Sequence, residues 1–478
     1  MTDRNSGGRY PERDRSRSGR YSTTTKRKMS ARAHARRQRN SQTSILISVV
    51  VIVVVLAVAL YTFFNWNQIV SVANTFKGEV IVTPTPEPTS MPSPTPTIAG
   101  TATPKPTVSP NPQATTTPRP EVIDFTISVA GDLSFYNSQL IDAYDESTDS
   151  YDFTHNFENI APYIQDADLA LANFNSAAAG SALGYSGDPE SFNVPAAALD
   201  AIAEAGFDVM MTANQSVFHQ GWAGLQFTKN YIREADMIST GTNLSEGEYY
   251  QPLIVNVEGV KIAILNYADE EIIDSIKPFV SADQMAYAIK ELKMSSVNRD
   301  VNICVENQVD LIFAYVAWGS PGKMSVSDHQ KTYAQAMMEA GVDAIFGTHP
   351  QIIQQVKRKA VKMNNGKSNE GVVAYSLGSF LTAQRSTYYD SGMILNLTYQ
   401  HNSSTDQVTL VDVNYIPTWI SIEDTDTEDK NYTIIPVGKY LDDQELFSQL
   451  NTTAQARLRS VWTETTGIVG QNGITPIR

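Results

Sequence analysis

Three apolar runs in the sequence each end in a small polar cluster that could bind a ligand or a metal. They cover residues 127–132 (ISVAGD), 207–214 (FDVMMTAN) and 342–349 (VDAIFGTH). A strand that ends in Asp, Asn or His places that side chain on the rim of a sheet, where open α/β folds collect their ligand-binding groups. Asp132, Asn214 and His349 are therefore candidates for one shared site. Each cluster, taken alone, is equally compatible with a polar residue that only caps a turn and binds no ligand.

The second and third runs are preceded by nearly the same residues. Residues 204–208 (EAGFD) and 339–343 (EAGVD) nearly repeat, and each follows an alanine-rich helical pattern. Glycine after the last helical turn can adopt the left-handed conformation that ends a helix. The repeat predicts a helix, a glycine cap, a buried strand and then a polar loop.

Helical and strand patterns alternate over a region that begins near Val122, which predicts one α/β domain with a largely buried sheet. The helical patterns lie at 195–205, 224–235, 282–293 and 328–340, and the strand patterns at 254–257, 261–267, 310–316 and 371–375. We predict that this domain covers 122–440. We expect 441–478 to be a C-terminal tail with a helix near 442–463.

The first part of the chain has a different composition. Residues 1–40 contain 13 Lys+Arg and 3 acidic residues, hence 13 − 3 = +10, and the whole chain is −15, so the remainder carries −25. We expect 1–44 to be a disordered basic segment. The acidic remainder disfavours nucleic acid as a partner of the folded domain.

An uncharged apolar stretch follows the basic segment. Its 20 residues at 45–64 are long enough to cross a hydrocarbon core of about 30 Å. We predict a single transmembrane helix at 45–66 and a juxtamembrane segment at 67–80. The positive-inside rule places the N-terminus in the cytoplasm and the rest of the chain outside the cell membrane. Residues 81–121 are rich in Pro and Thr and predict a disordered extended stalk.

Six short motifs occur in order between about 122 and 420. They are Gly131-Asp132, Asn173-Phe174-Asn175, Ala213-Asn214-Gln215-Ser216 with His219 and Gly221, Ala317-Trp318-Gly319, Gly347-Thr348-His349-Pro350-Gln351, and Ser376-Leu377-Gly378-Ser379-Phe380. In this order and spacing they resemble the motif series of the CapA family, proteins named for capsule and poly-gamma-glutamate synthesis. The resemblance implies a metallophosphatase-like α/β sandwich. The glycines at matching positions are expected to serve turns that need a positive φ.

Four positions depart from the family pattern. Asn175 stands where the family has Glu, and Ser216, Ala317 and Gln351 stand where it has His. A hydrolytic metal site needs several Asp, Glu or His ligands to hold the cation and to lower the pKa of its bound water. The resemblance therefore predicts a degenerate metal site.

The motif residues that match the family pattern define our expectations for the site. Asp132 and His349 are the candidate catalytic residues. With Asn214, and with His219 as a speculative fourth donor, they would hold at most one divalent cation (Mn, Zn or Mg). The expected ligand-binding residues are Asn173, Asn214, Trp318 and Ser376.

Three functions fit these expectations. The first is a membrane-anchored envelope protein that binds or organises a capsule-type polymer or the capsule machinery. The second is an active metal-dependent hydrolase of phosphoesters or gamma-glutamyl amides that uses Asp132 and His349. The third is a spacer or sensor domain. The sequence leaves open whether the protein is an enzyme.

Overall fold

The computed structural model describes residues 121–424, 430–470 and 473–478. The predicted segments at 1–44, 45–66 and 67–80, and all but the last residue of the predicted stalk at 81–121, lie outside this part. None of the helices within the described part is long and apolar enough to cross a membrane.

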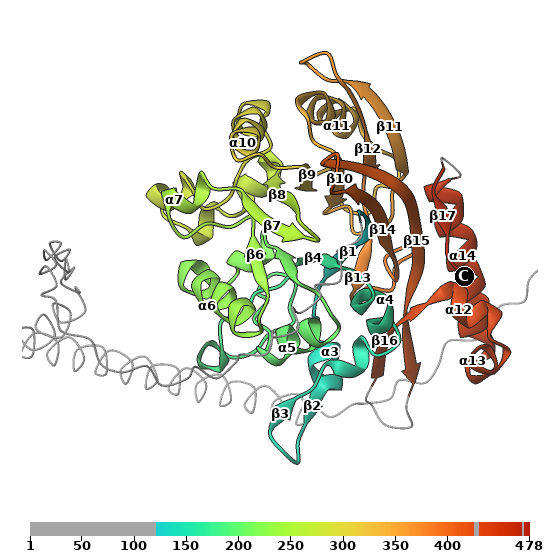
Figure 1. Ribbon diagram of the computed structural model, residues 1–478. Coiled ribbons are helices and arrows are strands. Elements are labelled where there is room, and N and C mark those ends of the chain that lie inside the picture. Colours follow the sequence, from blue (N-terminus) through green and yellow to red (C-terminus); the bar gives the residue numbers. More distant parts are fainter. Residues whose placement is uncertain (1–120, 425–429, 471–472) are drawn as a thin grey trace, which may run out of the picture. The chain divides into compact units, whose positions relative to one another are not determined.

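Two large sheets carry the domain (Figure 1). The first sheet has the order β16 (Lys430–Pro436), β15 (Gln407–Asp424), β14 (Ser391–Asn402), β1 (Val122–Leu133), β4 (Leu169–Phe174), β5 (Val209–Met211) and β6 (Ile238–Thr240), with β13 (Ser379–Leu381) on β1 and β17 (Thr475–Pro476) on β15. The second has the order β11 (Val356–Lys362), β12 (Ser368–Ala374), β10 (Ala344–Thr348), β9 (Leu311–Ala317), β8 (Val260–Ala268) and β7 (Leu253–Val257). In each sheet the central strands are parallel.

The alternation of side chains along the strands shows how the layers pack. On β9, Phe313 and Tyr315 enter the core between the two sheets, whereas Ala314 and Val316 enter the core under the helices that cover the second sheet. Both faces of this strand are buried, as expected of a central strand in a parallel sheet. The order of layers is helices, sheet, sheet, helices, so the predicted α/β sandwich is confirmed.

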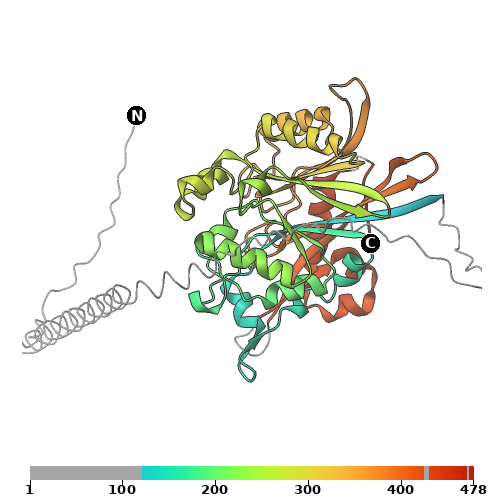
Figure 2. The same cartoon turned by 60° about the vertical axis from the view of Figure 1, so that its left-hand side comes forward.

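Helices cover both outer faces. The first sheet is covered by α3 (Asn137–Ala143), α4 (Ala161–Gln165), α5 (Ala197–Glu204) and α6 (Gly221–Glu234), and the second by α10 (Met294–Glu306) and α11 (Asp328–Ala340). Short helices α7 (Glu246–Tyr249), α8 (Glu270–Ser275) and α9 (Ala282–Met285) lie in the connections. In Figure 2 the green helices lie below the strands and the yellow to orange helices above them.

The two repeated segments, 204–208 and 339–343, have the predicted structure of a helix end and a glycine cap, and each is followed by a strand. Gly206 follows α5 with φ 102°, and Gly341 ends α11 in the left-handed conformation with φ 118°. Strands β5 and β10 begin a few residues later. These two connections therefore deliver Asn214 and His349 to the same side of the molecule as expected.

Two predicted elements differ from the structure. Only 282–285 of the pattern at 282–293 is helical, and the longer helix α10 begins at Met294. The expected tail is instead part of the domain: α12 (Val437–Asp442), α13 (Gln444–Gln449) and α14 (Thr452–Val469) form a core with Trp419 of β15. The single helix expected near 442–463 is broken because Asn451 caps the N-terminus of α14 through the backbone N–H of Ala454.

Candidate functional site

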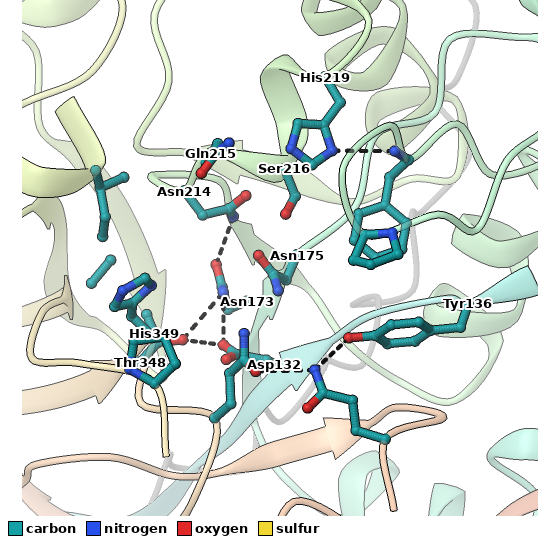
Figure 3. Close-up of a pocket in the computed structure, with 17 residues that line it drawn as sticks. Asp132, Tyr136, Asn173, Asn175, Asn214, Gln215, Ser216, His219, Thr348 and His349 are labelled. Carbon is teal, nitrogen blue, oxygen red and sulfur yellow. Dashed lines mark hydrogen bonds between the residues drawn. The ribbon is translucent and has the colours of Figure 1, made fainter. Parts of the chain in front are cut away.

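A cavity of about 250 Å³ lies where the carboxyl ends of β1, β4 and β5 meet the end of β10 from the other sheet (Figure 3). Its lining includes Asp132, Asn173, Asn214, His219 and His349. Five of the seven residues expected at the site are thus brought together by strands that are far apart in sequence.

Asp132 lies at the floor of the cavity and is 2 % exposed. Its Oδ1 accepts hydrogen bonds from Asn173 Nδ2 at 2.8 Å and from the Thr348 hydroxyl, which approaches from the second sheet. The backbone N–H of His349 also donates to this carboxyl group. Burial raises the pKa of Asp132, and these three donors only partly offset the effect because they favour the charged form.

The two asparagines continue the hydrogen bonding away from Asp132. Asn214 Nδ2 donates to Asn173 Oδ1 at 3.1 Å and to the carbonyl oxygen of Phe174 at 3.0 Å. The remaining amide oxygen, Asn214 Oδ1, accepts from the backbone N–H of Val217 at 3.2 Å. Both side-chain amides are therefore oriented by their partners, and both amide oxygens already accept a proton donor (Figure 3).

His219 lies on the opposite wall of the cavity from Asp132 (Figure 3). Its Nδ1 accepts the backbone N–H of Phe192 at 3.2 Å, and its ring stacks on the Phe192 ring with centroids 5.8 Å apart. Burial lowers the pKa of His219 to about 4, with a small opposing effect from Asp188. The imidazole is consequently neutral at physiological pH, and because Nδ1 is an acceptor, its proton is on Nε2.

His349 occupies a strained backbone position beside Asp132. Its φ is +86°, which a residue with a Cβ rarely adopts and which is concentrated at functional sites. Burial lowers the pKa of His349, whereas the nearby carboxylates of Asp132, Glu271 and Asp269 act in the opposite direction. Burial is the larger effect, so this imidazole is neutral as well.

Sequence comparison places these residues in a known family. The family model for bacterial capsule synthesis protein PGA_cap matches residues 126–384, which is more than half of the chain. The chain belongs to this family. The prediction of a CapA-type protein is thereby confirmed.

Two curated relatives are similar to this member of the capsule synthesis family. The capsule biosynthesis protein CapA of Bacillus anthracis is 27 % identical over 251 residues, which are 50 % of this chain and 56 % of the relative. The PGA biosynthesis protein CapA of Bacillus subtilis is 22 % identical over 271 residues, which are 54 % of this chain and 65 % of the relative. The chain thus spans less than two thirds of the length of each.

Two solved structures share a weaker likeness with this family member. A novel phosphatase from Mycoplasma pneumoniae has a TM-score of 0.37 and 12 % identity, covering 69 % of this chain and 100 % of its own. A structure described as a 5′-nucleotidase from Staphylococcus aureus has a TM-score of 0.39 and 12 % identity, covering 71 % of this chain and 58 % of its own. Scores this low leave the metallophosphatase-like description of the sandwich a prediction.

The donor set of this capsule family member does not fit a catalytic metal. The amide oxygens of Asn173 and Asn214 and the Oδ1 of Asp132 all accept hydrogen bonds within the protein. Over the described ranges there is no group of three or more His, Cys, Asp or Glu residues that could hold a metal ion. Resident metal sites need about three strong protein ligands. The single divalent cation expected from the sequence therefore remains a prediction, and the arrangement of the donors argues against it.

Two residues expected to bind ligand do not line the cavity. Trp318 is fully buried, and its Nε1–H donates to the carbonyl oxygen of Tyr375 at 2.9 Å. Ser376 is also fully buried, and its hydroxyl accepts the backbone N–H of Gly378. Their burial argues against both expectations, because a motif position does not reveal whether a side chain faces the cavity or the core.

Other lining residues were not predicted as ligand-binding. Thr348 comes from the same loop as His349, so its position was the available signal. Tyr136, Phe192 and Gln384 also line the cavity, and Gln384 Nε2 donates to the Tyr136 hydroxyl at 2.6 Å. Nothing in the local sequence distinguishes Gln384 from other polar loop residues.

The glycines of the matching motifs serve two different purposes. Gly221, Gly319 and Gly378 have positive φ, as expected. Gly131 and Gly347 do not, and are needed for close backbone approach: a Cβ would lie 1.9 Å from the carbonyl oxygen of Gly378 in the first case and of Tyr375 in the second. These two contacts bring the strands close together behind the cavity.

Proposed function

We propose that this chain is an envelope protein that supports the synthesis or export of a capsule or a poly-gamma-glutamate type polymer by binding a ligand in the Asp132 cavity, without hydrolysing it. Membership of the capsule synthesis family and similarity to the two CapA proteins support the capsule role. We further propose that the segment at 45–66 anchors the chain in the cell membrane, with the N-terminus in the cytoplasm and the α/β domain outside.

One observation supports the binding function: Asp132, the single carboxylate among the described residues that line the cavity, has few strong metal ligands near it. Asp132 accepts bonds from Asn173, Thr348 and the His349 backbone. A hydrolytic metal site needs several strong ligands, and the described residues contain no group of three or more His, Cys, Asp or Glu that could hold a metal ion. Since His219 and His349 are neutral, the cavity offers directed hydrogen bonds, and its charge is that of Asp132.

The alternative is a metal-dependent hydrolase that acts on phosphoesters or gamma-glutamyl amides. It is favoured by the proximity of Asp132 and His349, which come from different sheets yet lie in the same cavity. Hydrolysis would require the Asp132 carboxylate, whereas binding requires only the shape and hydrogen bonding of the site. Replacing Asp132 by its amide distinguishes the two.

A complementation experiment tests the proposal. The gene would be deleted in the bacterium that encodes this chain and restored as wild type or as Asp132→Asn, and surface polymer would be quantified by extraction and chemical assay. We expect Asp132→Asn to restore at least half of the wild-type polymer, because Asn is isosteric and its oxygen can still accept from Asn173.

The matched control fills the cavity without touching a carboxylate. Ser216 is 8 % exposed and lines the cavity, so Ser216→Phe should restore little polymer while reaching wild-type abundance on immunoblots. Loss of polymer in Asp132→Asn to the level of the deletion, at normal abundance, would contradict a binding role and support the hydrolase.

A further inference from the structure

Exposed apolar side chains gather next to the cavity. Eleven large hydrophobic side chains are exposed in the described part of the chain, and four of them come from two short segments, 141–144 and 183–185. Tyr144 is 41 % exposed and Tyr185 is 37 % exposed. A concentration of exposed apolar area in a soluble domain commonly marks a binding surface.

Tyr144 and Tyr185 of these segments form one row of rings with Tyr151, which lies between them, and we term this row the tyrosine shelf. The ring centroids of Tyr144 and Tyr151 are 5.1 Å apart, and those of Tyr151 and Tyr185 are 5.3 Å apart. Tyr151 also stacks on the buried ring of Phe153. The shelf is therefore held by the core, although β2 (Tyr144–Asp145) and β3 (Ser150–Tyr151) project from the body of the domain (Figure 1).

The shelf is connected to the cavity by one loop. Two residues after Tyr185, the backbone N–H of Gly187 donates to Asn137 Oδ1 at 2.7 Å, directly beside the cavity residue Tyr136. The same loop then supplies Pro189 and Phe192 to the cavity wall. The loop that carries Tyr185 therefore also forms part of the cavity wall.

The charge around the shelf restricts the ligand. Neither 141–154 nor 181–193 contains Lys or Arg, whereas they contain Asp and Glu at 142, 145, 146, 149, 152, 188 and 190. Tyr144 Oη donates to one of these carboxylates, Asp149, at 2.8 Å. Such a surface repels polyanions, so neither poly-gamma-glutamate nor a phosphate polymer matches it.

The lining of the cavity points the same way. Its side chains include no Lys or Arg, and the amides of Asn175, Gln215, Gln351 and Gln384 line it together with the neutral His219. Amide groups and aromatic rings together recognise a ligand that has many hydroxyl groups and weakly polar faces.

We infer that the tyrosine shelf and the cavity form one binding track for a neutral polysaccharide chain. The inference rests on the proposed binding function of the cavity and adds the chemical class of the ligand. Tyr144 and Tyr185 provide ring faces on which sugar units pack, and the acidic residues around them exclude anionic polymers.

Binding by the full chain to surface polysaccharide of the encoding bacterium tests the inference. The extracted polysaccharide would be separated by anion exchange into neutral and acidic fractions, and both would be compared with poly-gamma-glutamate by bio-layer interferometry. We expect saturable binding to the neutral fraction alone. Tyr144→Ala and Tyr185→Ala should each weaken it on the order of tenfold, since exposed aromatic anchors dominate such contacts.

Tyr250→Ala is the matched control, because Tyr250 is 46 % exposed and lies outside the shelf, and its affinity should equal that of wild type. Circular dichroism should show that all three variants are folded. Binding to the acidic fraction or to poly-gamma-glutamate, absence of binding to the neutral fraction, or unchanged affinity in both shelf variants would each overturn the inference. The proposed binding role of the cavity fails by a different result, the loss of polymer in Asp132→Asn.

Discussion

Replacing Gly347 by alanine is expected to remove about 3 kcal/mol or more of folding stability, a large share of the total of a typical domain. The added Cβ would lie 1.9 Å from the carbonyl oxygen of Tyr375 and 2.5 Å from Nε1 of Trp318. Backbone and a buried indole cannot move aside as a flexible side chain could. Urea denaturation followed by tryptophan fluorescence would measure the loss.

Gly467→Ala is the control for this substitution. Gly467 lies within α14, and a Cβ there would meet nothing within 4 Å. Alanine favours a helix more than glycine does by roughly 0.5–1 kcal/mol, so this variant should be slightly more stable than wild type. A Gly347→Ala protein as stable as wild type would show that the strands behind the cavity are not as closely packed as described.

Asp132→Asn is expected to stabilise the protein at neutral pH by about 1–3 kcal/mol, because it removes a charge from a buried position. The gain should depend on pH. Burial raises the pKa of Asp132 above its usual value near 3.8, so the wild-type protein loses stability as pH rises through that raised pKa. The difference between variant and wild type should therefore be small near pH 4 and should grow as pH rises through the raised pKa of Asp132.

Thermal unfolding of both proteins between pH 4 and 8 would measure this difference. Asp124→Asn is a suitable control, since Asp124 is an exposed carboxylate on the same strand, and its unfolding curve should follow that of wild type. If Asp132→Asn were less stable than wild type at neutral pH, the donors from Asn173, Thr348 and His349 would stabilise the carboxylate by more than its burial costs.

The parts of the site that could be predicted from sequence are those set by local rules. Gly206 and Gly341 end helices, and the strands that follow bring Asn214 and His349 to the carboxyl edges of two sheets. Asp132 ends a strand in the same way. Since the parallel strands of one sheet end at a common edge, the convergence of Asp132 and Asn214 could be expected from the order of elements. His349 joins them from the second sheet, through the packing of the two sheets.

The remaining features depend on packing between distant segments. Thr348 bonds to Asp132 across 216 positions, and Gln384 reaches Tyr136 across 248. Trp318 and Ser376 have suitable side chains but face the core. No local pattern encodes these choices, because they are fixed only when the two sheets pack against each other.

The residues after 440 show the same limit. Their sequence indicated a polar tail, yet Leu458 and Val461 of α14 pack into a core with Trp419 of β15. The apolar face of α14 has a modest amphipathic pattern, and its partner lies in a strand about 40 positions earlier. Tertiary burial rather than local pattern decides that this segment belongs to the domain.

The central claim is that the Asp132 cavity works by hydrogen bonding and holds no catalytic metal. Its most direct test is isothermal titration of the full chain with Mn²⁺, Zn²⁺ and Mg²⁺, together with the metal content of the protein purified from its own host. We predict less than about 0.1 equivalent of bound metal and no saturable binding that depends on Asp132. One equivalent of metal, lost in both Asp132→Ala and His349→Ala, would contradict the account and establish a metal centre.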